Sequence, residues 1–231
     1  MKVAVINFSG NVGKSTIGKH LLQARIPNAE YIAVETLNAD EGSDETVRGK
    51  DFGILQEQIQ LIDDAVIDVG ASNVEDFVKL MQHYRGSHVD FDYFVVPAVK
   101  DSKQIRDTIA TNSALNAMGV PTKKIRVVFN MLDFDETVES AFFPLIEYHK
   151  DKKNFTLRTD AAIIFSELYQ KLRSYNLTIP ELLADNTDYK AKLREAKDQA
   201  EKERAVAMIS MRRLAISAKE NLDTVYATIS K

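Results

Sequence analysis

The stretch KVAVINFSGNVGKSTIG occupies residues 2–18 and joins a short apolar run to a glycine-rich loop and the start of a helical pattern. Residues 3–8 are nearly all apolar, which is typical of a buried strand, and residues 15–26 have helical spacing. A loop between a strand and a helix binds phosphate well, because the helix N-terminus offers free N–H groups and the positive end of its dipole. The stretch therefore predicts a phosphate-binding loop at the end of the first strand.

The residue types within the loop fit this interpretation. Gly10 and Gly13 let the backbone wrap with its amides pointing inward, where side chains would obstruct. Lys14 can reach the β- and γ-phosphates of a nucleotide, and the Ser15 hydroxyl can ligate Mg²⁺. We therefore expect a nucleotide to be held by Ser9, Gly10, Asn11, Val12, Gly13, Lys14, Ser15 and Thr16.

Strand and helix patterns alternate along the rest of the first 165 residues. Apolar runs predict further strands at 31–36, 65–69, 92–99 and 124–132, with a weaker one at 154–158. Helical patterns lie between them, and the one at 72–84 opens with Ser-x-x-Glu, a capping-box signal. This alternation predicts an α/β fold: a mostly parallel P-loop NTPase sheet covered by helices on both faces.

The last part of the chain has a different pattern. Residues 181–231 contain neither glycine nor proline, and apolar positions recur there every three or four residues. We expect a P-loop NTPase domain at 1–180 and a helical C-terminal extension at 181–231, packed on the domain or serving as a partner arm. One helix over 187–230 would be about 66 Å long, so a break near 200–206 or a partner is expected.

Composition excludes several classes of protein. The formal net charge is −4, so no overall basic field exists to drive binding to nucleic acid or membranes. The chain has no cysteine, and therefore neither disulfides nor thiolate metal sites, and its four histidines are scattered. No apolar run reaches the length of a transmembrane helix, and the N-terminus does not fit a signal peptide. These features predict a cytoplasmic protein without a transmembrane segment.

Phe8 stands where the common G-x-x-x-x-G-K-[ST] loop has its first glycine. The stretch resembles the deviant Walker A loop x-K-G-G-x-G-K-[ST] of the ParA/MinD group of ATPases, with Gly10, Gly13, Lys14 and Ser15 in matching places. That resemblance implies ATP and Mg²⁺ as cofactors and a homodimer, at least with ATP. The group's signature lysine, which reaches the partner's nucleotide, is replaced by Ser9, so the trans-lysine mechanism is not carried over.

The same resemblance assigns roles to residues outside the loop. IDVGAS (67–72) is similar to the group's strand-end aspartate and switch segment, which implies that Asp68 holds Mg²⁺ through water. VETLNADEG (34–42) lies where the group places the acid that positions the attacking water, with Asp40 preferred and Glu35 as the alternative. Asn130 corresponds to an asparagine that reads the adenine edge, although N-M-L-D at 130–133 leaves GTP open.

The segments MKVAVINFSGNVGKST, VETLNADE and IDVGASNVEDF together resemble StbB-type plasmid stability proteins, a family that includes the conjugal transfer protein TraL. The resemblance implies an ATPase for plasmid stability, intracellular positioning, partition or conjugal transfer, working with a separate DNA-binding plasmid protein or conjugation component. Since Ser9 replaces the lysine, we expect hydrolysis that is slow or partner-stimulated. The alternatives are an adaptor that holds nucleotide and recruits a partner through its helical tail, and a P-loop enzyme acting on a small molecule.

Direct DNA binding is expected to be weak or absent. Two groups of basic residues stand in the chain, one around the fourth helix and fifth strand and one in the tail. Basic residues of this kind are usually charged side chains on solvent-exposed faces. The negative net charge of the chain also opposes strong binding to DNA. The first group comprises Lys100, Lys103, Arg106, Lys123, Lys124 and Arg126.

Overall fold

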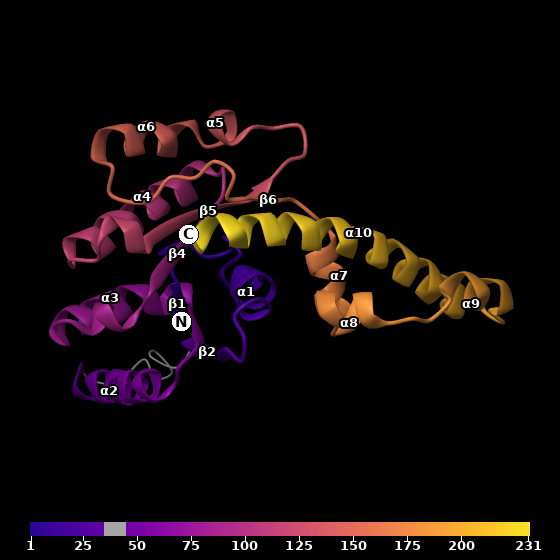
Figure 1. Ribbon diagram of the computed structural model, residues 1–231, viewed down its shortest axis with the longest axis horizontal. Coiled ribbons are helices and arrows are strands. Elements are labelled where there is room, and N and C mark those ends of the chain that lie inside the picture. Colours follow the sequence, from indigo (N-terminus) through magenta and orange to yellow (C-terminus); the bar gives the residue numbers. More distant parts are fainter. Residues whose placement is uncertain (35–44) are drawn as a thin grey trace.

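The computed structural model describes residues 1–34 and 45–231, with side chains described for 1–34 and 51–231. In these residues, six strands form one sheet in the order β2-β3-β1-β4-β5-β6 (Figure 1). Every pairing between neighbouring strands is parallel, so the predicted α/β fold is confirmed. The strands are β1 Lys2–Val5, β2 Glu30–Val34, β3 Ala65–Val69, β4 Tyr93–Ala98, β5 Ile125–Leu132 and β6 Ala162–Ile164.

The last strand of the sheet is not the one that the sequence predicts. Residues 154–158 contribute a single parallel bridge, between Arg126 and Thr156, and β6 lies further along the chain at Ala162–Ile164. A strand of three residues is too short to show a pattern by itself. β6 is a strand because it pairs with β5, and this contact between distant residues cannot be read from the local sequence.

Helices cover both faces of the sheet, as predicted, and β1 shows how the two faces are separated. Ala4 belongs to one buried apolar cluster, whereas Val3 and Val5 belong to the other, because successive side chains of a strand point to opposite faces. The first face is covered by α2 Glu45–Leu61, α3 Val74–His83, α4 Ser102–Ala117, α5 Val138–Ala141 and α6 Phe143–Lys152. The second is covered by η1 Ile17–Gln23, α7 Leu168–Tyr175, α8 Ile179–Ala184 and α10 Gln199–Ile229.

The capping box predicted before the third helix is not formed. A short 3-10 turn, η2 Ala71–Asn73, precedes α3, so that Asn73 becomes the N-cap and Ser72 lies inside the turn. The Asn73 side chain makes no capping hydrogen bond to α3 and instead donates to the Val34 carbonyl at 2.9 Å. The first turn of α3 is still acidic, with Glu75 and Asp76 near the positive end of its dipole.

The tail is broken into two helices. α9 Tyr189–Glu195 ends at Ala196, whose backbone is extended, and α10 begins at Gln199 with the Asp198 side chain as its N-cap. α10 has 31 residues, and its C-terminal half lies across the second face of the sheet (Figure 1). Its N-terminal half extends away from the sheet beside α9 (Figure 1).

The strand order fixes where a ligand is expected. From β1 the chain crosses to β2 on one side of the sheet, whereas from β4 it continues to β5 on the other side. β1 and β4 are neighbours, so a crevice opens between their carboxyl ends. The loop after β1 lies at this point.

Candidate functional site

The loop between β1 and α1 Lys14–Thr16 has the backbone of an anion-binding turn. Asn11 and Gly13 take left-handed φ angles of 58° and 88°, and conformations of this kind turn neighbouring amides to one side. Gly13 has no room for a side chain, because a Cβ atom would lie 2.2 Å from Asn130 Nδ2. The second glycine of the motif is therefore required both by its φ and by the space around it.

Buried polar side chains support the loop from behind. Asn7 is fully buried; its amide donates to Pro97 O at 2.7 Å and Thr108 Oγ1 at 2.8 Å, and its oxygen accepts from the Ser9 amide at 2.7 Å. Asn130, at the end of β5, donates from Nδ2 to the Val12 carbonyl at 2.9 Å. The loop is thus attached to β4, α4 and β5 before any ligand binds.

Lys14 is the buried cation of the loop. Its Nζ donates to the carbonyl oxygens of Ser9 at 2.7 Å and Asn7 at 3.1 Å, and the residue is 8% exposed. Burial lowers the pKa of Lys14, and the nearby charge of Asp68 opposes that shift. The two carbonyls therefore hold the Lys14 ammonium group at the mouth of the loop. Phosphate oxygens of a ligand can replace these carbonyls as its hydrogen-bond acceptors.

Asp68 is the buried carboxylate opposite this cation. It lies on β3, which pairs with β1, and its register partner there is Val5. Tyr31 of β2 donates its hydroxyl to Asp68 Oδ2 at 2.7 Å. Asp68 Oδ1 is buried and has no hydrogen-bond partner among the described residues, which is costly for a carboxylate unless a ligand satisfies it.

These side chains fit a magnesium ion bound with a nucleotide. Ser15 and Asp68 line the same cavity, and a hydroxyl and a carboxylate are both hard oxygen ligands. No group of three or more His, Cys, Asp or Glu residues in the described ranges could hold a metal ion alone. A site with few protein ligands is what Mg²⁺ uses when phosphate oxygens and water complete its shell.

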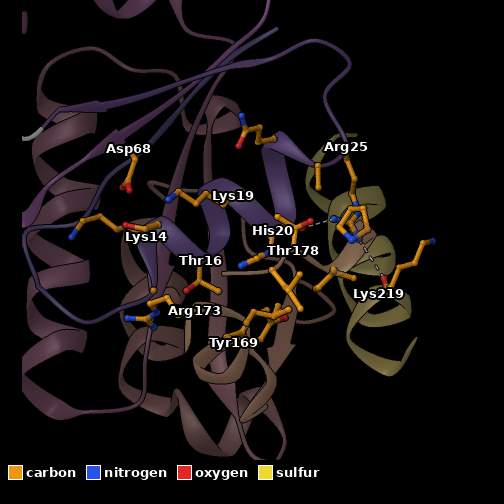
Figure 2. Close-up of a pocket in the computed structure, with 18 of the residues that line it drawn as sticks. Lys14, Thr16, Lys19, His20, Arg25, Asp68, Tyr169, Arg173, Thr178 and Lys219 are labelled. Carbon is orange, nitrogen blue, oxygen red and sulfur yellow. Dashed lines mark hydrogen bonds between the residues drawn. The ribbon is translucent and has the colours of Figure 1, made fainter. Parts of the chain in front are cut away.

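The cavity is a cleft of about 1460 Å³ that runs from the loop along η1 to α7, α8 and α10 (Figure 2). Small-molecule sites usually have about 300–1000 Å³, so the cleft exceeds the upper end of that range. Its second wall comes from residues that the sequence did not single out. They are Lys19, His20, Arg25, Tyr169, Arg173, Thr178 and Lys219 (Figure 2).

Two aromatic rings of this wall are largely buried. The rings of His20 and Tyr169 are tilted, with centroids 5.6 Å apart. Burial lowers the pKa of His20 to about 4, and the charges of Lys19, Arg173 and Arg25 act in the same direction. Burial raises the pKa of Tyr169 to about 12. Both side chains are therefore neutral at pH 7 and offer a ligand hydrogen-bonding groups without charge.

The structure brings most of the predicted loop residues into the cleft. Ser9 and Val12 are 4% and 0% exposed and lie behind the loop; they contribute backbone rather than side-chain contacts. Asn130 is also buried behind the loop, under Gly13, and its role toward a base stays a prediction. The predicted residues that line the cleft are Gly10, Asn11, Gly13, Lys14, Ser15, Thr16 and Asp68.

The acid that would position water cannot be placed. Asp40, the preferred residue, and Glu35, its alternative, both lie outside the described residues. Tyr31 is a contact that sequence reasoning missed, since an aromatic residue in an apolar strand carries no functional signal. The wall residues of α7 and α10 were missed because they follow the loop by about 150–200 positions and only folding brings them near it.

Comparisons with known proteins agree with the architecture. No family model and no curated protein matches the chain. Solved structures do: apo McdA from Cyanothece has 13% identity and a TM-score of 0.53, covering 78% of this chain and 92% of McdA. The MinD cell division protein of Aquifex aeolicus has 13% identity and a TM-score of 0.50, covering 94% and 97%.

The MinC:MinD cell division complex of the same organism gives 12% identity, a TM-score of 0.50, and coverage of 94% of this chain and 95% of the matched chain. No helix in the described residues is long and apolar enough to cross a membrane. At this identity the likeness concerns the backbone, and the chain has the α/β fold that McdA and MinD share.

Proposed function

We propose that the chain is a Mg²⁺-dependent ATP-binding protein of the ParA/MinD type that hydrolyses ATP slowly by itself. The observation that carries this proposal is the presence of two buried opposite charges in one cleft, Lys14 in the preformed loop and Asp68 on the neighbouring strand β3. Lys14 would hold the β- and γ-phosphates, Ser15 and Asp68 the magnesium ion, and the loop amides the remaining phosphate oxygens. Bound Mg²⁺ would neutralise charge that develops on the phosphates during hydrolysis.

Slow turnover follows from the residue at position 9. Ser9 is buried and its carbonyl is bonded to Lys14, so neither its side chain nor its position supplies a second cation. A cation of the arginine-finger kind contributes about 10³–10⁵ in rate, or roughly 4–7 kcal/mol of the barrier. Without it, we propose that hydrolysis waits for a partner.

Exposed apolar side chains at the carboxyl edge of the sheet support partner binding at this face. Phe134 is 92% exposed, Phe165 60% and Met131 40%, and all three follow or end β5 and β6 at the carboxyl edge of the sheet. Large apolar side chains exposed at one edge of a protein can mark an interaction site. We propose that they form part of an ATP-dependent homodimer contact, in a system for plasmid stability, partition, positioning or conjugal transfer.

A second candidate function is a nucleotide-holding adaptor with little hydrolysis. The half of α10 that extends away from the sheet beside α9 favours it, because a helical arm of this kind can recruit a partner (Figure 1). Arg212 fastens the arm to the segment after α8 by pairing with Asp185 at 3.1 Å, and its guanidinium lies 4.6 Å from the Tyr189 ring.

Direct DNA contact is proposed to be weak, with a separate DNA-binding protein as partner. Several residues of the basic group have partners within the protein. Lys100 pairs with Asp133 at 2.5 Å and Glu136 at 2.7 Å, Lys124 donates to two backbone carbonyls, and Arg126 stacks on a tyrosine ring. These cations are less available to phosphate groups than free surface lysines would be.

The test is calorimetric titration of the purified protein with ATP, ADP, GTP and GDP, each with and without magnesium. We expect ATP to bind more tightly with magnesium, and Lys14→Ala to weaken binding several hundredfold. Lys103→Ala, an exposed lysine on α4, is the matched control and should bind as the wild type does. Absence of binding by all four nucleotides would overturn the proposal.

Phosphate release measured on the same preparations separates the two candidate functions. Turnover that rises with a partner, or with protein concentration, supports the ATPase. Tight binding with no release under any of these conditions supports the adaptor. Fast release by the isolated monomer contradicts the role assigned to Ser9.

A further inference from the structure

The carboxylate of Asp68 is held in one orientation by a neighbouring strand. Tyr31 and Asp68 lie on adjacent strands, where Asp68 is in register with Ala33, two residues after Tyr31. The Tyr31 hydroxyl donates to Asp68 Oδ2 at 2.7 Å. A carboxylate with one oxygen fixed in this way can rotate little, so the position of its second oxygen is determined.

The second oxygen is the one available to a ligand. Asp68 is 6% exposed, and its Oδ1 is buried without a hydrogen-bond partner among the described residues. Lys14 influences it through charge, but Lys14 Nζ makes its hydrogen bonds to the carbonyls of Asn7 and Ser9. A buried carboxylate oxygen that the protein leaves unsatisfied in a polar cleft is a position for an ion or its bound water.

The Tyr31 ring is itself fixed by the helix that follows the phosphate loop. A Cβ atom on Gly18 would lie 3.0 Å from Cε2 of Tyr31 and 3.3 Å from its hydroxyl oxygen, so the ring packs directly on the glycine backbone. On another side, Lys19 Nζ lies 5.3 Å from the ring centroid. The loop helix, Tyr31 and Asp68 thus form a continuous chain of contacts.

We propose that Tyr31 is a positioning residue for the magnesium ion: its hydroxyl orients Asp68 so that Oδ1 faces the ion's bound water. This inference rests on the proposed function and adds a residue to its site. Partners that orient a metal-binding side chain in this way typically change metal affinity by about 10–100-fold when they are removed. Tyr31 touches neither nucleotide nor phosphate in this assignment, so its effect on the ion passes through Asp68.

The experiment measures ATP affinity by calorimetry over a magnesium series that starts in chelator and ends at saturation. Its readout is the magnesium concentration at which half of the affinity gain is reached. Tyr31→Phe keeps the ring and its contacts with Gly18 and Lys19 but loses the hydroxyl. We expect this variant to require about tenfold more magnesium, with unchanged affinity for ATP in chelator.

Three other variants help to interpret this result. Gly18→Ala keeps the Tyr31 hydroxyl but displaces the ring, and should shift the magnesium requirement in the same direction by a smaller factor. Asp68→Asn removes the carboxylate itself and should give the largest increase in the magnesium midpoint. Tyr93→Phe is the matched control, because Tyr93 is also a strand tyrosine with a hydrogen-bonded hydroxyl, but its acceptor is the Ser230 backbone oxygen at 3.5 Å and it lines a different cavity.

The outcomes separate this inference from the proposed function. If the wild type gains ATP affinity with magnesium and Tyr31→Phe has the same magnesium midpoint, the positioning role is refuted and the nucleotide site stands. If the wild type binds no nucleotide, the function fails and the inference fails with it. A shift in Tyr93→Phe equal to that of Tyr31→Phe also refutes the role, since it would report a general loss of stability. Circular dichroism and thermal unfolding of each variant confirm that it folds.

Discussion

The two walls of the cleft are built in opposite ways. The loop wall comes from neighbouring residues, 10–16, and is attached to the sheet by buried hydrogen bonds through Asn7 and Asn130. The facing wall comes from η1 and the residues after it together with α7, α8 and α10, and some of its charges pair with one another: Asp223 accepts from Arg25 at 2.7 Å and from Lys219 at 2.7 Å. Local sequence therefore determines the phosphate end, whereas tertiary packing determines the other end. We expect affinity to depend mainly on the loop wall.

Lys14→Ala should have the largest effect. Removing one partner from a buried, hydrogen-bonded pair of charges costs about 3–4 kcal/mol, so ATP affinity should fall several hundredfold. The variant also frees the carbonyls of Asn7 and Ser9, which gives a second, structural cost. Calorimetry measures the loss. A fall of less than about tenfold would mean that the loop wall does not dominate.

Gly13→Ala should come second, because it deforms the loop without removing a charge. A non-glycine residue at φ 88° costs about 1–2 kcal/mol, and the new Cβ would also push against Asn130 Nδ2. We expect about 3 kcal/mol of lost stability in urea unfolding, together with weak nucleotide binding. Gly86→Ala is the matched control, since Gly86 also has a positive φ, of 93°, but open space around it. Equal losses in both variants would show that backbone conformation alone is responsible.

His20 in the facing wall should make the free energy of unfolding depend on pH. The pKa of His20 is 6.5 in the unfolded chain and about 4 in the folded protein. Between these pH values His20 is protonated in the unfolded chain but neutral in the folded protein, so lowering the pH favours unfolding. Stability should fall by about 2 kcal/mol between pH 7 and pH 5 for this reason. His20→Gln should reduce that slope in urea unfolding, whereas His83→Gln, an exposed histidine on α3, should keep it. An unchanged slope in His20→Gln would place the pH dependence elsewhere.

Arg173→Ala should have the smallest effect. Arg173 is exposed, lines the cleft, and forms no ion pair within the described part of the chain. An exposed charge of this kind contributes about 0.5–1 kcal/mol, so ATP affinity should fall about threefold. Lys171→Ala is the control on the same helix, because Lys171 pairs with Glu167 at 2.9 Å. A loss near that of Lys14→Ala would reverse the comparison between the two walls.

The same contrast explains how much the sequence could predict. The loop and the strands around it follow from local patterns, because glycine conformation, apolar runs and helix starts are properties of neighbouring residues. β6 was misplaced and Tyr31 was missed because each depends on a partner strand. The predicted capping box is wrong because Ser72 lies inside a 3-10 turn and Asn73 becomes the N-cap of α3. The facing wall needed three helices that only the folded chain brings to the loop.

The position of α10 has a consequence for the order in which this chain folds. Leu222, Val225 and Ile229 pack in the same apolar cluster as Val3 and Val5 of the first strand. During synthesis, η1 can cover part of that face early, but the part that these three residues cover stays exposed until more than 210 residues after the first strand have been made. Contacts between such distant residues form late, because closing a long chain segment costs entropy that local contacts do not. Nascent chains of this protein should therefore depend on shielding of the exposed face until the last helix arrives.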